Sequence, residues 1–183
     1  YPLSSFFMVV ATENPVGMEG TYPLPLAELD RFSLRLSLGY PDEDTERSIL
    51  EDDPTRTLLP SLRPVVDLEE IRRLRRRAEE LYCAPAVLSA VTRILRKTRD
   101  HRGIRYGASP RGGLHLVAVM RALALIRGRD YVSDVDLEDA VVPVLAHRLR
   151  AEDYAENVAH IVTAIRDEEA ATLRADAAGR GAS

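Results

Sequence analysis

The chain has 183 residues, 45% of them hydrophobic, which allows one domain, or one small domain plus a piece of another, around a real core. Its net charge of −4 argues against a nucleic-acid-binding surface over the whole chain. Cys83 is the only cysteine, which excludes an internal disulfide and a cysteine-based metal site and predicts a small buried hydrophobe. No apolar run reaches the roughly 18 residues of a membrane span and no signal-type start is present, so we predict a soluble, cytoplasmic protein.

The first part of the chain predicts two strands. Residues 6–12 form a continuous apolar, β-rich run, typical of a strand that is covered on both faces. Apolar and polar residues then alternate over 32–38, which predicts a second strand. Between them lie an Asn-Pro corner at Asn14, a Gly- and Pro-rich loop, and a short acidic turn that carries Arg31. A carboxamide at a strand tip and an arginine on a nearby turn suit a site that handles phosphates.

The rest of the chain predicts helices. A short helix is expected over 42–50, a linker with three prolines over 51–66, and an amphipathic helix over 68–82. Pro85 and Ser109-Pro110 suit the starts of two further helices, and Ser133 with Asp136 resembles a capping box for a helix that Pro143 kinks or splits. A last helix is expected over 155–174. The predicted class is mostly α: an αβα remnant of two strands, then a C-terminal helical bundle.

Several segments together resemble one family. ATENP (11–15), EGTYPLPLAELDRF (19–32), GYP (39–41), GASPR (107–111) and PVLAHRL (143–149) look like the MoxR branch of the AAA+ ATPases, in the right order and spacing over about residues 6–150. The resemblance implies that 1–40 is the end of the αβα nucleotide-binding core and 41–66 a linker with a short helix. It further implies that 67–150 is the helical lid and 151–183 a C-terminal helix with a frayed tail.

The resemblance assigns roles to three residues. Asn14 matches sensor 1, an amide that can hold the γ-phosphate or the attacking water. Its competing interpretation is an Asn-Pro turn with a locally bonded side chain. Arg31 matches the arginine finger, which acts on the ATP of the adjacent subunit and is typically worth about 10³ to 10⁵ in turnover. Its competing interpretation is an Asp30–Arg31 surface turn.

Arg111 matches sensor 2, and its position is unusual in physical terms. A cation in the first turn of a helix is unfavourable unless an anion lies nearby, because helix N-termini attract anions. The competing interpretation is an arginine that turns back to a nearby carboxylate. Gly112-Gly113 departs from the small, non-glycine residues usual in the family, and two glycines weaken a first helical turn by roughly 1 kcal/mol each.

The sequence contains no phosphate loop and no strand ending in Asp-Glu. With Lys97 as its only lysine, a G-x-x-x-x-G-K-[ST] motif cannot be built. We therefore expect a C-terminal piece of a longer protein that uses ATP and Mg²⁺, with the Mg²⁺ ligands outside this chain and no metal site within it. This fragment alone is predicted neither to bind ATP tightly nor to hydrolyse it. Its two strands are expected to have unsatisfied edges.

The resemblance also implies a biological role. It suggests a chaperone-like remodeller that assembles into a ring, typically a hexamer, and helps partner proteins mature or acquire metal cofactors. A client with a von Willebrand factor A-type domain is implied by the family. Two alternatives stay open: a non-catalytic helical interaction module, and a DNA-associated AAA+ protein, against which the charge balance argues.

Two other signals have structural interpretations. The arginine run over 72–77 has glutamates at helical spacing, so an ion-paired, solvated face is preferred over a nucleic-acid patch. The four histidines share no metal-binding spacing, and His115 and His147 lie in apolar helices where they suit core or interface positions.

Overall fold

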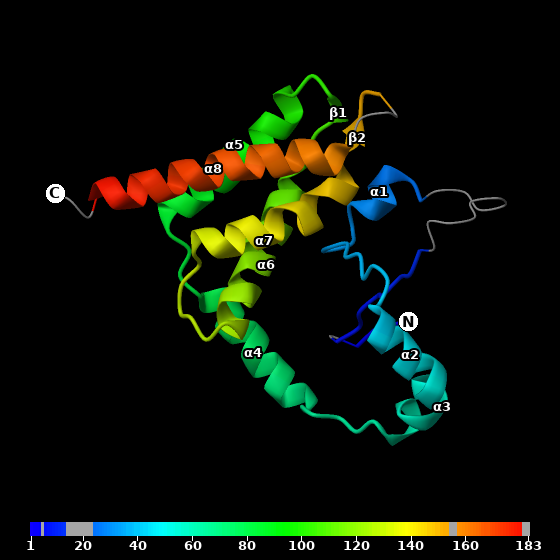
Figure 1. Cartoon of the computed structure of the whole chain (residues 1–183). Coiled ribbons are helices and arrows are strands. Elements are labelled where there is room, and N and C mark those ends of the chain that lie inside the picture. The colour runs from blue at the N-terminus through cyan, green and yellow to red at the C-terminus, as the bar shows by residue number, and fades with distance from the viewer. Residues whose placement is uncertain (5, 14–23, 154–156, 181–183) are drawn as a thin grey trace.

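The computed structural model describes residues 1–4, 6–13, 24–153 and 157–180. It is mostly helical, which confirms the predicted class. Figure 1 shows a bundle of long helices, with residues 24–40 lying against one end of it and an arm that leads from them back to the bundle. Among the described residues, no helix is long and apolar enough to cross a membrane.

The bundle is built from α5 (Pro85–Asp100), α6 (Pro110–Ile126), α7 (Asp134–Leu145) and α8 (Val158–Arg180). α7 packs against both α6 and α8, α5 closes the bundle against α6 and α8, and α4 (Leu68–Glu80) lies on α6. The core side chains are apolar and largely inaccessible to solvent; the largest are Ile94, Leu116, Met120, Leu137, Leu145 and Val141. Cys83 joins this core, as predicted, and burial raises the pKa of its thiol.

Helix starts follow the predicted caps. The Ser109 hydroxyl accepts a hydrogen bond from the Gly112 N–H at 3.2 Å, and Pro110 occupies the first turn of α6. At the start of α7 the Ser133 N–H donates to the Asp136 carboxylate at 2.9 Å, which forms the predicted capping box. α7 is not split at Pro143; it continues to Leu145 and is followed by the 3-10 helix η2 (Ala146–Arg148).

The two strands of the structure lie elsewhere than predicted. β1 (Ile104–Tyr106) and β2 (Arg150–Ala151) form a small antiparallel pair at one end of the bundle, with Ile104 opposite Ala151. The strands expected over 6–12 and 32–38 are not formed in the described residues, so that prediction was wrong. A strand requires hydrogen bonds to a neighbour, and these extended segments form no ladder; Met8 and Leu36 are about two-thirds exposed or more, at 77% and 68%.

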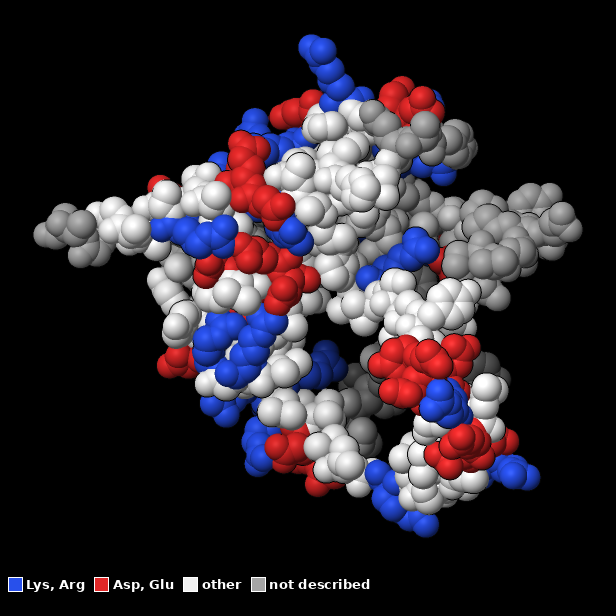
Figure 2. Space-filling model, in the orientation of Figure 1, with Lys and Arg blue, Asp and Glu red and all other residues white. Residues whose placement is uncertain are grey.

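The arm between the two parts of the chain consists of α2 (Glu43–Asp52), α3 (Pro54–Thr57) and the 3-10 helix η1 (Leu59–Ser61). Asp42 caps α2 by accepting a hydrogen bond from the Thr45 N–H at 2.8 Å, and this bond lowers the pKa of Asp42. None of these helices contains a buried residue. Acidic side chains gather over α2 in Figure 2.

Ion pairs connect the last helix to the bundle. Glu169 of α8 is only 3% exposed and receives Arg93 Nε at 2.6 Å and Lys97 Nζ at 2.7 Å, both from α5. Burial would raise the pKa of Glu169, but the bonds from Lys97 and Arg93 outweigh burial and lower it. On α4, Arg72 pairs with Glu69 and Arg73 with Glu70, at 3.1 and 2.5 Å, which agrees with the predicted ion-paired face.

Candidate functional site

The site lies where the turn at residues 30–33 (the 30–33 turn) meets the end of α7 and the start of α6. The turn follows the short helix α1 (Leu26–Leu29), which contacts η2. Its centre is Arg148 of η2, whose side chain is 1% exposed. Sequence reasoning did not identify Arg148. The only available signal was an arginine within the apolar segment PVLAHRL, which predicts burial without indicating the partner.

The Arg148 guanidinium is fully used in this position. Nε donates to the Val144 carbonyl at 2.7 Å, which fixes the side chain against α7. Nη1 donates to the Asp30 carbonyl at 2.7 Å and to its carboxylate at 3.0 Å. Nη2 donates to the carbonyls of Phe32 and of Ser33. Burial lowers the pKa of Arg148 and Asp30 opposes this, so the cation is retained through its acceptors.

The Asp30 carboxylate joins three elements. Besides Arg148 it accepts a hydrogen bond from the Ser109 hydroxyl at 3.1 Å, and Arg111 Nη1 lies 3.3 Å from its second oxygen. Ser109 therefore both caps α6 and binds the 30–33 turn. Segments about eighty and about a hundred and twenty residues apart in the sequence meet at one carboxylate, and they are the same segments that carry the family resemblance.

Arg111 projects from the first turn of α6 and is 56% exposed. Asp30 is the nearby carboxylate toward which the competing interpretation expected Arg111 to turn. An exposed pair at 3.3 Å is worth little, at about 0–1 kcal/mol, so the guanidinium can exchange this partner for a stronger anion at small cost.

Two glycines let α6 begin this close to its neighbours. A Cβ on Gly112 would lie 3.3 Å from Leu145 and 3.5 Å from Arg148, and one on Gly113 would lie 2.7 Å from Leu95. The departure from the family pattern is therefore accounted for by packing, and the first turn of α6 is formed despite the low helix propensity of glycine.

Arg31 lies at the tip of the 30–33 turn with its side chain 70% exposed. It forms a long ion pair with Glu28, in which Nη1 and the carboxylate are 3.8 Å apart. The side chain can therefore reach outward from the molecule, while its backbone is fixed on both sides by Arg148.

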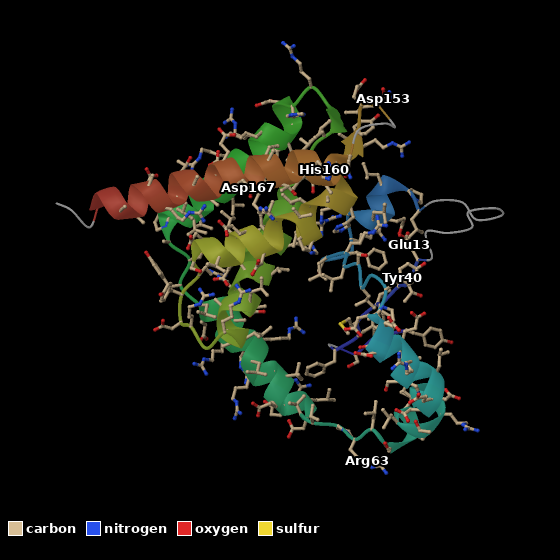
Figure 3. All side chains as sticks on the ribbon, in the orientation of Figure 1. Glu13, Tyr40, Arg63, Asp153, His160 and Asp167 are labelled. Atoms are coloured by element: carbon tan, nitrogen blue, oxygen red, sulfur yellow. The ribbon has the colours of Figure 1, made fainter. Side chains whose placement is uncertain are left out.

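Asn14 lies outside the described residues, so its position stays a prediction. The residue before it is described: Glu13, labelled in Figure 3, lies 3.4 Å from Arg35 Nη2. The Arg35 N–H in turn donates to the Pro143 carbonyl at 2.9 Å. The segment that leads into Asn14 is thus tied to the same end of α7 as the 30–33 turn.

The histidines near the site are structural. His147 is 7% exposed, and its Nε2 lies 3.2 Å from the Phe32 carbonyl oxygen, which accepts the hydrogen bond. Burial lowers the pKa of His147, and burial with the neighbouring Arg148 lowers the pKa of His115. Within the described residues no group of His, Cys, Asp and Glu is arranged to hold a metal ion.

Comparison with known families assigns both parts of this arrangement to one class of protein. The pattern described as "ATPase family associated with various cellular activities (AAA)" matches residues 1–34, and the pattern described as "AAA lid domain" matches residues 96–168. The first match contains the 30–33 turn and the second contains Arg111 and Arg148. The arrangement is thus that of an AAA-type ATPase, with part of the core and a helical lid.

Individual relatives narrow the class. The chain is 36% identical over 158 residues to "Chaperone MoxR1" of Mycobacterium tuberculosis, a match that covers 81% of this chain and 41% of the relative. It is 28% identical over 160 residues to "Protein MoxR" of Paracoccus denitrificans, covering 77% and 47%. It is also 37% identical over 147 residues to "Uncharacterized protein YeaC" of Bacillus subtilis, covering 80% and 46%. The two family patterns and the relatives named MoxR together support a MoxR-family AAA+ ATPase.

A solved structure agrees with this assignment. A crystal structure of a proposed ATPase from Cytophaga hutchinsonii superposes with a TM-score of 0.80 at 27% identity, over 90% of this chain and 54% of that one. The chain spans less than half the length of the curated relatives it matches.

Proposed function

We propose that this chain is the C-terminal portion of a MoxR-type ATPase that couples ATP hydrolysis to the remodelling of partner proteins. The observation that carries the proposal is the convergence at Asp30: the start of α6, with Arg111, and the turn that bears Arg31 are held by one carboxylate. Two arginines that could act on phosphates, one on its own subunit's nucleotide and one on a neighbour's, therefore project from backbone segments that meet at one carboxylate.

Each residue has a chemical role in this proposal. Arg111 would leave the weak pair with Asp30 for a nucleotide phosphate, a stronger and more highly charged acceptor. Arg31, exposed and directed outward, would neutralise charge on the phosphoryl group transferred in the adjacent subunit. Asn14 would orient the attacking water or the γ-phosphate. ATP and Mg²⁺ would be held mainly by a phosphate loop and acidic strand end outside this chain, so the chain alone is expected to be inactive.

The proposal also covers the domain boundaries, the oligomeric state and the client. We place the core remnant in residues 1–40, the linker in 41–66, the lid in 67–150 and a C-terminal helix in 151–183; α8 completes the bundle core through Val162 and Ile165. A finger that acts between subunits requires a ring, for which we propose six subunits in the cytoplasm. The proposed client is a partner protein whose maturation or metal-cofactor assembly needs remodelling, such as one with a von Willebrand factor A-type domain.

The decisive experiment uses the full-length protein and mixed rings. Arg31→Ala should reduce ATP turnover by about 10³-fold or more, because it removes the charge supplied to the neighbouring site. Mixing these subunits with subunits that carry a defective phosphate loop but an intact Arg31 should restore part of the activity. Absence of recovery, with both proteins shown to co-assemble, would contradict an action between subunits.

The alternative is a non-catalytic helical interaction module. The apolar core of α5–α8 is complete without residues 1–40, which favours a unit able to fold by itself. The two candidates differ in one simple observation: the full-length protein either contains a phosphate loop ahead of residue 1 and hydrolyses ATP, or it does neither.

A further inference from the structure

A buried cation of the lid holds the turn that carries Arg31. Arg148 comes from η2, yet four of its five hydrogen bonds go to residues 30, 32 and 33. The Asp30 carbonyl belongs to the peptide unit that precedes Arg31, and the Phe32 carbonyl belongs to the peptide unit one residue beyond it. A planar guanidinium with donors in a fixed fork constrains both peptide units at once, which a single point charge cannot do.

The turn has little other backbone support. Its remaining backbone bonds are local: the Asp30 N–H donates to the Leu26 carbonyl at 2.9 Å, and the N–H groups of Arg31 and Phe32 donate to the carbonyls of Glu28 and Leu29, both at 3.1 Å. α1 has no buried residue and is only one turn long. The Arg31 side chain itself is 70% exposed with one distant partner. The direction in which Arg31 points is therefore set by the backbone that Arg148 fixes.

Two neighbours assist Arg148 without replacing it. The Ser109 hydroxyl binds the Asp30 carboxylate at 3.1 Å, and His147 Nε2 lies 3.2 Å from the Phe32 carbonyl oxygen. Each of them reaches only one side of Arg31. Arg148 alone among these three side chains binds the backbone on both sides.

We propose that Arg148 is a positioning residue. It binds the turn that carries the arginine finger, Arg31, to the lid of its own subunit, so that the lid and Arg31 move together relative to the neighbour's nucleotide. This inference rests on the proposed function, in which Arg31 acts between subunits. It assigns to Arg148 no contact with the nucleotide. Its effect must therefore be larger in the neighbour's site than in its own subunit's site.

The loss of rate expected for Arg148→Lys follows from the displacement of Arg31. A misplacement of about 1 Å in a group that stabilises a transition state can cost about 10²-fold in rate. Arg148→Lys keeps the charge and most of the apolar stem and removes the fork, so the three rotatable donors of one ammonium replace five hydrogen bonds of fixed direction. We expect the turn to remain attached and to lose its fixed orientation.

Mixed rings separate the two sites. The hydrolysing subunit carries Arg31→Ala and an intact phosphate loop. The finger-donating subunit carries Arg31 and a defective phosphate loop, so activity arises where it supplies its finger to a hydrolysing neighbour. With Arg148→Lys placed on the finger-donating subunit, recovered turnover should fall about 10²-fold. With Arg148→Lys placed on the hydrolysing subunit, whose own finger is already absent, the loss of recovered turnover should be at least about tenfold smaller than with the variant on the finger-donating subunit.

A matched control and a second readout complete the test. Arg129→Lys alters a partly buried arginine, 23% exposed, that binds Asp136 through two bonds of 2.6 and 2.7 Å, far from the 30–33 turn in the sequence. Placed on the finger-donating subunit, it should leave recovery unchanged. Hydrogen–deuterium exchange of the peptide that covers residues 30–35 should be about tenfold faster in the 183-residue Arg148→Lys chain than in the wild-type or Arg129→Lys chains.

The outcomes are distinguishable. If the parent mixture shows no recovery, the proposed action of Arg31 between subunits is refuted, and the positioning role falls with it. If the parent mixture recovers but Arg148→Lys has equal effects on the hydrolysing and the finger-donating subunit, whether large or absent, only the positioning role is overturned. Unchanged exchange in residues 30–35 would also overturn it.

Discussion

Gly107 precedes the Ser109-Pro110-Arg111 start of α6, and the structure leaves no space for a side chain there. A Cβ at this position would lie 2.6 Å from Arg99 Cα and 2.8 Å from Arg99 N. Contacts of this kind are normally at least about 3.5 Å, so the loop or helix α5 would have to shift by about 1 Å. The obstructing atoms belong to the backbone of a helix and cannot move by a change of rotamer.

The shift would also strain two hydrogen bonds that anchor this loop. The Ala108 N–H donates to the Thr98 hydroxyl at 3.0 Å, and Arg99 Nε donates to the Ala108 carbonyl at 2.8 Å. Overpacking costs about 1–3 kcal/mol, and each weakened bond adds about 1 kcal/mol. The lower entropy of the unfolded alanine chain returns about 0.4–1 kcal/mol. We therefore expect Gly107→Ala to reduce the free energy of unfolding by about 2–4 kcal/mol.

Thermal unfolding followed by far-UV circular dichroism measures this effect. For a chain of this size each kcal/mol corresponds to about 2–4 °C, so Tm should fall by about 4–16 °C. Gly179→Ala is the matched control, because a Cβ there meets nothing within 4 Å and its effect should lie between 0 and about 1 kcal/mol of stabilisation. A Tm for Gly107→Ala within about 2 °C of the wild type would refute the steric argument.

Three further predictions concern stability and reactivity. Thr98→Val should destabilise the chain by about 1–3 kcal/mol in urea titrations, because it leaves the buried Ala108 N–H without its acceptor; a loss below about 0.5 kcal/mol would contradict this. Burial would raise the pKa of Asp136, but the bonds from Arg129 and Ser133 lower it overall, so its stabilising contribution is present above pH about 3.9 and is lost as pH falls through the lower folded value. The Tm difference between wild type and Asp136→Asn should accordingly shrink only below pH about 4, and a difference that shrinks near neutral pH would exclude this cause. Cys83, 8% exposed and with its thiol pKa raised by burial, should react with a thiol reagent at least about tenfold more slowly in the folded than in the urea-unfolded chain, and equal rates would show that the site is open.

Local signals in the sequence were sufficient for most of the bundle. Ser109-Pro110 and the pair Ser133 and Asp136 mark helix starts because each cap satisfies backbone donors within three residues, so no distant contact is needed to predict them. The strands expected over 6–12 and 32–38 failed for the opposite reason. Apolar runs and alternation show only that a segment suits a sheet, while a strand also needs a neighbouring strand.

In the candidate site, too, the sequence identified the residue with a local signal and missed the residue that depends on distant contacts. Arg111 was identifiable because a cation at a helix start breaks a local electrostatic rule, and the structure supplies Asp30 as its carboxylate. Arg148 was not identifiable, because its acceptors in residues 30–33 lie more than a hundred positions earlier in the chain. A buried arginine shows in the sequence only as a charged residue in an apolar segment, with nothing to indicate which carbonyls it binds.

The pairing of Lys97 with Glu168 and Glu169 has a practical consequence. Because Lys97 is the only lysine in the sequence, its ammonium is the one side-chain target for amine-reactive dyes and for a lysine-specific protease. That target sits within α5, so cleavage there requires the helix to open, whereas acylation requires only that the partly exposed ammonium leave Glu168 and Glu169. A chain that carries a single natural reporter of this kind lets opening of α5 be timed by cleavage without introducing any label.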